Sequence, residues 1–369
     1  MKKSIFSLIF LIIGNYLVAQ NLNVVKEPEV FPDQPRREIR MPQLEGYVII
    51  KGDFHLHTVF SDGSVWPTVR VQEAWRDGLD AIAISDHVEY RPKREFLSGS
   101  LNQVHQIALP EAEKYGIILV KSAEITRRMP PGHLNALFLN DIDELDTESW
   151  QEALEAARKQ GAFIFWNHPG WQAQQPDTCI WFDEHEKLMK QDLIHGVEVY
   201  NFDEWYPVAL NWCREKNLAF IANSDIHEPV PYMPGYSNYF RPMTLVIARE
   251  KTEQAMKEAM FNRQTVAFFA GKLAGPQLWL EKMFYASVGV GKPFNIKPDG
   301  SASITLSNLT DIPITLKNDQ GKTFQLEALS AVVIPVANLS QPTELPFIIT
   351  NFFTGTEENL RVNLQLNMP

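Results

Sequence analysis

The chain has 369 residues, of which 45% are hydrophobic and 21% are charged, and its formal net charge is −11. This composition is typical of a folded globular protein, and the length predicts one large domain with a smaller one beside it. The acidic balance argues against non-specific nucleic-acid binding, because no surplus of lysine and arginine is available to neutralise phosphates. A small phosphorylated substrate is compatible with this charge, since bound metal ions can invert the local field.

The first 20 residues have the pattern of an export signal. Lys2 and Lys3 precede the apolar run Ile5–Ile13, which is too short to span a bilayer. No cysteine follows this run directly, so no lipid attachment site is indicated, and the cleavage position stays open. We therefore expect an exported protein, periplasmic or secreted, without a stable membrane anchor. Residues 21–46 are rich in Pro, Glu and Arg, have no clear period, and are interpreted as a linker or strap.

From residue 47 onward, short apolar runs alternate with amphipathic segments of helical period. The apolar runs predict strands at 47–50, 81–84, 117–120, 136–139, 163–166, 197–200, 219–222 and 244–247. The amphipathic segments predict helices at 67–77, 103–115, 148–160, 182–191, 204–215 and 252–261. Alternation of this kind favours a parallel sheet, and seven or eight repeats favour a closed or nearly closed (β/α) barrel. The predicted fold class is therefore α/β, with the barrel domain over 47–272.

After about residue 273 the helical pattern ends and short alternating strands take its place. They are predicted at 301–309, 312–318, 322–329, 331–337, 345–352 and 360–366, with turn-forming clusters between them. This pattern predicts a small all-β sandwich domain over 273–369. Because the segment contains no histidine, we expect it to have a packing or scaffolding role.

Chemically reactive side chains of the first domain gather where the predicted strands end. Six of the nine histidines and three carboxylates lie at or just after these ends: His55, His57, His87, His133, His168, His227, Asp62, Glu124 and Asp225. The carboxyl ends of barrel strands meet on one face, so these residues should converge. Any one histidine alone would more simply be structural, but so many polar groups cannot share a buried face without strong partners. Imidazole and carboxylate ligands suit zinc, iron or manganese. The other histidines, His105, His185 and His195, are interpreted as solvated or locally bonded.

The order of these motifs resembles the PHP (polymerase and histidinol phosphatase) superfamily over about 46–272. The motifs are Asp53-x-His55-x-His57 followed by Ser61-Asp62-Gly63, then Ser85-Asp86-His87, Glu124, His133, Asn167-His168-Pro169 and Ser224-Asp225-x-His227. The resemblance implies a distorted (β/α)7 barrel that binds up to three divalent ions, zinc, manganese or iron, at the carboxyl face.

The same resemblance implies how the ligands divide among three metals. The first ion would be held by His55, His57, Glu124 and Asp225. The second would be held by Glu124, as a bridge, with His133 and His168, and the third by Asp62, His87 and His227. Many family members have histidine where Asp62 stands here, and this difference leaves the metal identity open.

The resemblance further implies a hydrolase in which a metal-bridging hydroxide attacks a phosphoester, and no serine or cysteine nucleophile motif competes with this mechanism. Glu124, Asp225 and His227 are the candidate catalytic residues, and the general acid is left open between His227 and Asp86. Arg127 and Arg128, in the loop between two ligands, are candidates for binding the phosphate. Trp171 is a candidate for binding the organic part of the substrate.

Three functions are weighed against each other. Export and the all-β tail favour a phosphodiesterase for small organic molecules, similar to bacterial enzymes that degrade organophosphate diesters. The main alternative is a phosphomonoesterase of the histidinol-phosphate or nucleotide phosphatase kind. The third is a metal-dependent binding protein without catalysis. A small phosphoester is the expected partner, nucleic acid is not, and the oligomeric state stays open.

Overall fold

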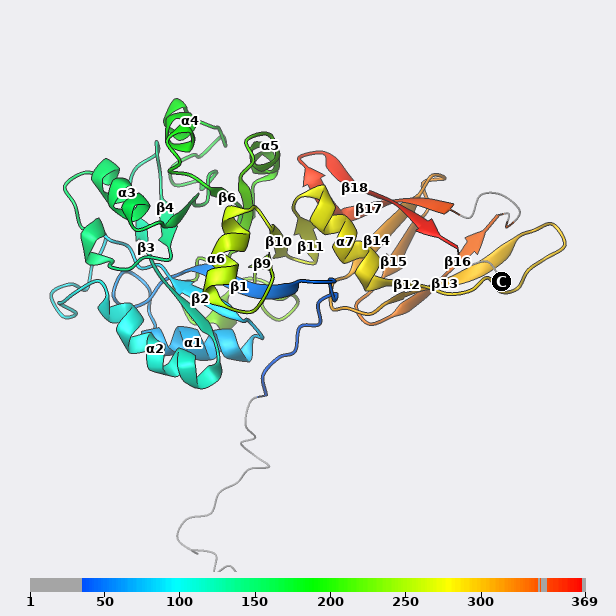
Figure 1. Cartoon of the computed structure of the whole chain (residues 1–369), viewed down its shortest axis with the longest axis horizontal. Helices are drawn as coiled ribbons and strands as arrows, with labels where there is room; N and C mark the ends of the chain where they lie inside the picture. Colours follow the sequence, from blue (N-terminus) through cyan, green and yellow to red (C-terminus); the bar gives the residue numbers. More distant parts are fainter. Residues whose placement is uncertain (1–34, 338, 340–343, 367–369) are drawn as a thin grey trace, which may run out of the picture. The chain divides into compact units, whose positions relative to one another are not determined.

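A computed structural model describes residues 35–337, 339 and 344–366 (Figure 1). The predicted export signal and most of the predicted linker lie outside the described residues. The described residues from Arg36 onward belong to one unit. Within the part of the chain that is described, no helix is long and apolar enough to cross a membrane.

Each of the eight predicted strands and six predicted helices of the first part is present. The strands are β1 (Val48–Leu56), β2 (Ala81–Ile84), β3 (Ile118–Ile125), β4 (Leu134–Leu137), β5 (Phe163–Trp166), β6 (Gly196–Asn201), β8 (Ala219–Asn223) and β9 (Met243–Ala248). The helices are α1 (Pro67–Arg76), α2 (Gln103–Tyr115), α3 (Trp150–Lys159), α4 (Asp183–Lys190), α5 (Pro207–Glu215) and α6 (Glu253–Phe261). Three short strands were not predicted: β7 (Glu204–Trp205), β10 (Thr265–Phe269) and β11 (Lys272–Ala274).

The strands form an open mixed sheet with no closed barrel among the described residues, so the predicted barrel, closed or nearly closed, is not confirmed. Their order is β11-β10-β9-β1-β2-β3-β4-β5-β6-β7, with β8 beside β6. Among the described strands from β1 to β11, the pairs β1–β2, β2–β3, β5–β6 and β6–β8 are parallel and the others are antiparallel. In the described residues, the end of β8 and the chain after it meet β1 through the isolated bridge Leu56–Ile226 and several hydrogen bonds, but no ladder closes the ring.

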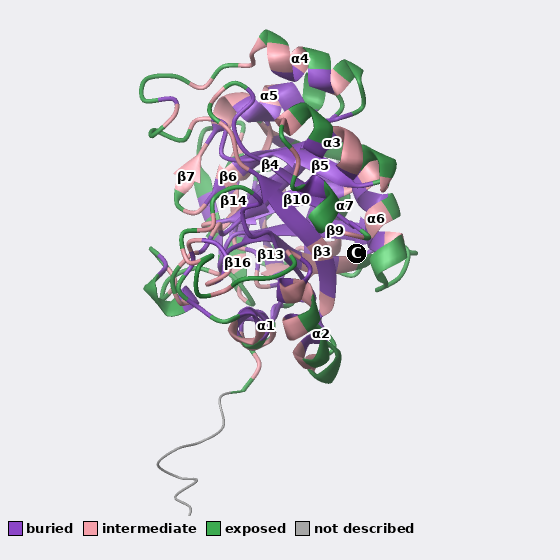
Figure 2. Cartoon of the chain, turned by 90° about the vertical axis from the view of Figure 1, so that its left-hand side faces the viewer, coloured by how far each residue is buried: buried purple, intermediate pink, exposed green. Residues whose placement is uncertain are grey.

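Short connections explain why the sheet is mixed. The loop 126–133 between β3 and β4 is shorter than the dozen or so residues that a parallel crossover needs, so β4 returns antiparallel. The strands are nevertheless buried between helices, whose outer faces are exposed (Figure 2). The helices α1 and α2 lie side by side along one flank (Figure 1).

The C-terminal strands form two packed layers. One layer is the three-stranded sheet of β12 (Val288–Val290), β13 (Ala302–Asn308) and β16 (Ala331–Val336). The other contains β14 (Ile314–Asn318), β15 (Thr323–Leu326), β17 (Glu344–Gly355) and β18 (Glu358–Gln365). Buried positions alternate along β13, β14 and β18, as the period-two pattern predicted.

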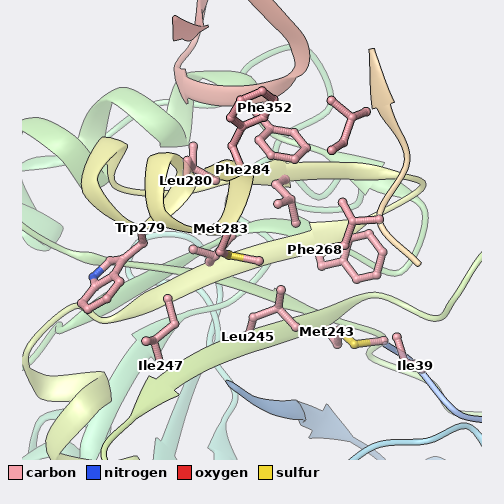
Figure 3. Close-up of a cluster of buried hydrophobic side chains, with 14 of the residues drawn as sticks. Ile39, Met243, Leu245, Ile247, Phe268, Trp279, Leu280, Met283, Phe284 and Phe352 are labelled. Carbon is pink, nitrogen blue, oxygen red and sulfur yellow. The ribbon is translucent and has the colours of Figure 1, made fainter. Parts of the chain in front are cut away.

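Strand pairing and apolar packing cross the boundary predicted at residue 273. A seventh helix, α7 (Gln277–Ser287), follows it where the helical pattern was expected to have ended. Beyond it, β17 pairs in parallel with β11, so the second C-terminal layer continues the sheet of the first part. Figure 3 shows α7 side chains packed with residues of β9, β10 and β17 in one apolar cluster. The helix was missed because its sequence is apolar without a clear polar face.

Candidate metal centre

The end of β1 places two imidazoles beside a carboxylate from the segment after β8. His55 and His57 are fully buried, and alternation along a strand points them to the same side. Their Nε2 atoms lie 3.2 and 3.0 Å from Asp225 Oδ1, and each lies 3.3 Å from Glu124 Oε2. Four ligands around one tetrahedral zinc ion are roughly 3.3 Å apart, given bonds of about 2 Å. These four side chains therefore have the spacing that the first predicted ion requires.

Glu124, at the end of β3, faces imidazoles on both sides. Its Oε1 lies 2.8 Å from His133 Nδ1 and 3.8 Å from His168 Nε2. Its Oε2 lies 2.9 Å from His87 Nδ1. The carboxylate is thus positioned to bridge two ions. The tightest group at this point is His87, Glu124 and His133, whereas the resemblance implied His168 in place of His87.

A third group surrounds Asp62, in the loop after β1. Asp62 Oδ1 lies 3.2 Å from His227 Nε2 and 3.5 Å from His87 Nε2. His57 adjoins the same group, with its ring stacked 4.2 Å from that of His227. The three groups share members, so all nine predicted ligands lie in one cluster although the sheet does not close into a barrel.

The cluster contains candidate ligand atoms that lie close to opposite charges but form no well-oriented hydrogen bond. Five buried atoms of these side chains have no hydrogen-bond partner among the described residues: His57 Nε2, Asp62 Oδ1, His133 Nδ1, His168 Nδ1 and Asp225 Oδ1. An unsatisfied buried polar group costs about 1–3 kcal/mol. Convergence of several such atoms is the arrangement expected of a site that binds cations, and the nitrogen and oxygen ligand set suits zinc, iron or manganese.

Mutual electrostatics set the charge of the cluster. Burial opposes ionisation of His55, but the carboxylates of Asp225, Glu198 and Glu124 outweigh it and hold its pKa well above the usual value. Burial likewise opposes ionisation of Glu124, but the imidazoles around it hold the pKa of this carboxyl well below its usual value. The carboxylates therefore stay anionic, and metal ions compete with protons for the imidazoles.

Glu198 on β6 orients several of these ligands and was not predicted from the sequence. It is fully buried. Its Oε1 lies 2.9 Å from His55 Nδ1, and its Oε2 accepts a hydrogen bond of 2.8 Å from the backbone N–H of His168. Asn201 and Asn223 donate to the same carboxylate. The sequence feature that could have identified Glu198 is its position as a single charged residue within the apolar run 197–200.

Three predicted site residues that are not ligands have surroundings that differ from expectation. Asp86, considered as a general acid, accepts hydrogen bonds from the backbone N–H and hydroxyl of Thr58 and from the hydroxyl of Ser61. It therefore fixes the turn after β1. Arg127 pairs with Glu89, and neither Arg127 nor Arg128 lines the cavity at the cluster.

The cluster opens into a cavity of about 430 Å³. Seven of the nine ligands line it, and His55 and His57 lie beneath. Its remaining wall is aromatic and acidic and consists mainly of Tyr90, Trp171, Phe202, Tyr232, Asp203, Glu204 and Glu228. Trp171, a predicted substrate contact, lies with its ring centre 5.2 Å from that of His168. Among the residues the structure describes, no lysine or arginine lines the cavity.

Comparison with known proteins includes a solved structure that matches most of the chain. No family model matches the sequence. The structure is similar to the crystal structure of a two-domain protein from Bacteroides vulgatus ATCC 8482 that contains a predicted PHP-like metal-dependent phosphoesterase. The TM-score is 0.86 and the identity is 39%, covering 90% of this chain and 99% of that one. PsfC from Pseudomonas syringae PB-5123 is similar with a TM-score of 0.43 and 16% identity, covering 64% of this chain and 98% of that one. An uncharacterized protein from Methanocaldococcus jannaschii is 29% identical over 195 residues, which are 48% of this chain and 81% of that protein.

Proposed function

The chain belongs to the PHP-like metal-dependent phosphoesterases, and on that premise we propose that it hydrolyses phosphodiesters of small organic molecules. The observation that carries this proposal is the cluster of nine ligands at the floor of a cavity with an aromatic wall. A cavity of about 430 Å³ accommodates a small organic ester.

The ligand cluster is proposed to hold up to three divalent ions. Glu124 would bridge the ion beside His55, His57 and Asp225 to the one beside His133 and His168. Asp62, His87 and His227 would hold the third. Bound divalent ions lower the pKa of coordinated water and neutralise phosphoryl oxygens.

Neighbouring side chains would orient the metal ligands, and one exposed ligand could transfer protons. Glu198 holds the Nδ1 side of His55, which leaves Nε2 free to face the cluster. His227 is the most exposed of the ligands, with 36% of its side chain accessible at the cavity wall. Its Nδ1–H donates to the backbone carbonyl of Asp225, so Nε2 is the atom that can hold a proton or a cation.

The charge of the cavity wall favours diesters over monoesters. Three carboxylates that are not predicted ligands, Asp203, Glu204 and Glu228, line the wall, and no lysine or arginine among the described residues lines it. A phosphomonoester carries up to two negative charges near neutral pH, whereas a diester carries one. The same wall therefore repels a monoester more strongly, by Coulomb's law.

The test is a comparison of two substrates by the metal-loaded protein. The mature chain is loaded with Mn²⁺, Zn²⁺ or Fe²⁺, its metal content is measured, and kcat/KM is compared for bis(p-nitrophenyl) phosphate and p-nitrophenyl phosphate. We expect the diester to be the better substrate. A clear preference for the monoester would support the phosphomonoesterase alternative, and full metal occupancy without turnover of any ester would support a binding protein.

A substitution tests the ligand assignment. Replacing Glu124 by Ala should abolish turnover and lower the metal content, because it removes the shared ligand. The matched control is Glu155→Ala, on the exposed face of α3, which should retain both. Wild-type turnover by Glu124→Ala would contradict the assignment.

We also propose that the protein is exported, on the basis of residues 1–20 alone. Fractionation of expressing cells, with N-terminal sequencing of the product, tests this. A product in the cytoplasm that retains its first 20 residues would rule it out.

A further inference from the structure

We propose, resting on the function proposed above, that the organic part of the substrate carries a positive charge, as an alkylammonium or amine group, and that the outer wall of the cavity binds it. The metal cluster would bind the phosphoryl group, and this wall would select the alcohol attached to it. The proposed substrate class is thus a zwitterionic phosphodiester.

The outer wall has carboxylates without cationic partners. Asp203, Glu204 and Glu228 all line the cavity. Glu204 accepts a hydrogen bond from the hydroxyl of Tyr206, and Glu228 accepts one of 2.7 Å from the hydroxyl of Ser64. None of the three forms an ion pair among the described residues, as the salt bridges found there involve other carboxylates. The wall therefore presents negative charge to whatever enters the cavity.

Aromatic faces stand beside these carboxylates. Trp171 is 38% exposed, Tyr90 53% and Tyr232 77%, although all three line the cavity. Trp171 and Tyr90 also contact the ligands His168 and His87, so the aromatic surface begins directly at the metal cluster. Large aromatic faces left open beside negative charge are the surroundings that bind quaternary ammonium groups.

The turn between β6 and β7 brings both kinds of side chain to the cavity. Asn201 pairs with Glu204, so the turn itself consists of Phe202 and Asp203. Phe202 has a φ of 52°, which is rare for a bulky residue and costs about 1–3 kcal/mol. Glycine would relieve this strain but would remove the aromatic ring from the wall. The strain of this turn therefore favours a role for the Phe202 ring in binding the substrate.

Other occupants fit this wall less well. None of the residue groups spaced for a metal ion in the described chain includes Asp203, Glu204 or Glu228. An uncharged sugar or glycerol group could form hydrogen bonds with the tyrosine hydroxyls of the wall, but it would leave the three carboxylates without a counter-charge. A positively charged group matches both the charge and the aromatic surface.

The experiment compares two diesters of the same shape. One is p-nitrophenyl phosphorylcholine, and the other is p-nitrophenyl 3,3-dimethylbutyl phosphate, in which a carbon replaces the ammonium nitrogen. Both release p-nitrophenol, so kcat/KM is measured by the same signal. For the metal-loaded wild-type protein at low ionic strength, we expect the choline ester to be favoured about tenfold. The ratio should fall as salt is added, because exposed charges are screened.

Variants locate the source of the preference. Asp203→Asn combined with Glu204→Gln should lower the ratio toward one, because two negative charges leave the wall while the shape is kept. The matched control is Glu357→Gln, an exposed carboxylate that does not line the cavity, and it should keep the wild-type ratio. Thermal melting of each variant checks that it is folded.

The possible failures are distinguishable. If the wild-type protein hydrolyses both diesters with a ratio of one or less, this inference is overturned and the proposed function stands. An unchanged ratio in the folded double variant also overturns it. If the metal-loaded protein hydrolyses neither diester nor bis(p-nitrophenyl) phosphate, the proposed function itself fails.

Discussion

At the scale of single residues, Arg70 on α1 fixes the backbone of the ligand loops. It is fully buried, and all five of its N–H groups are used. They donate to the backbone carbonyls of His57, Ile226, His227 and Glu228, and to the carboxylate of Glu73, at 2.7–2.9 Å. One guanidinium thus ties the chain after β1 to the chain after β8, where no ladder joins the strands.

Replacing Arg70 by Lys should destabilise the protein and weaken metal binding. An ammonium group offers three donors against five, and a hydrogen bond from a charged group contributes about 1.5–3 kcal/mol. We therefore expect a loss of about 3 kcal/mol or more in the free energy of unfolding, and weaker binding at the Asp62, His87 and His227 group. Denaturant unfolding of the metal-free protein and metal titration measure the two effects. Arg158→Lys, on an exposed helix face, is the control, and equal behaviour of the two variants would refute this role.

Single residues differ in how well the sequence predicts them. The nine candidate ligands were found because each follows an apolar run, where polar side chains must meet at strand ends. The sequence positions of Arg70 and Glu198 do not indicate that they are buried, since a charged residue within a helix or strand is usually solvated. Only the tertiary structure shows that both are buried among polar partners.

At the scale of elements, α4 is attached to the loop before His133. His185 of α4 is fully buried, with its ring 3.7 Å from that of Trp166. Its Nε2–H donates to the carbonyl of Pro131 at 2.7 Å. Its Nδ1 accepts a hydrogen bond of 3.3 Å from the backbone N–H of Phe182, so the expected local bond is present, but the side chain is not solvated. Burial lowers the pKa of His185 to about 4.

This buried histidine should make stability depend on pH. Between pH 6.5 and 4 the unfolded chain binds a proton at His185 that the folded protein excludes, so stability falls as pH falls through this range. The loss attributable to His185 is up to about 3 kcal/mol. Denaturant unfolding of metal-free wild-type protein and His185→Gln at several pH values measures it. The wild-type protein should lose more stability on acidification, and identical pH profiles would contradict the prediction.

Helices and strands were predicted well where the hydrophobic period and the length of the segment indicated the same kind of element. The eight predicted strands and six predicted helices of the first part follow from clear periods, whereas β10, β11 and α7 do not. The buried side chains of α7 pack against β9, β10 and β17, and its exposed face includes Leu278 and Tyr285, so the sequence lacks the polar face that identifies a surface helix. The direction of the strands also could not be predicted from the local sequence pattern, because it depends on loop length and on neighbours distant in sequence.

At the scale of the whole described unit, one core joins the catalytic part to the C-terminal strands. The largest apolar cluster contains Leu245 of β9, Phe284 of α7 and Phe352 of β17, together with residues of both C-terminal layers. The parallel pairing of β11 with β17 continues the sheet across the same boundary. The sequence suggested two domains because composition changes near residue 273, but pairing and packing cross that point. The C-terminal layers therefore support the sheet that carries the candidate metal centre.

Phe352→Ala should lower the stability of both parts together. The side chain is 1% exposed, and truncation of a buried phenylalanine costs about 3–5 kcal/mol, which corresponds to a decrease in Tm of about 4–7 °C for a unit of this size. Because the core is shared, calorimetry of the metal-free protein should show a single transition, in wild type and variant alike. Val333→Ala, on a side chain that is 55% exposed in β16, should leave Tm nearly unchanged. Two separate transitions, with only the one from the C-terminal strands shifted by Phe352→Ala, would mean that the two parts unfold independently.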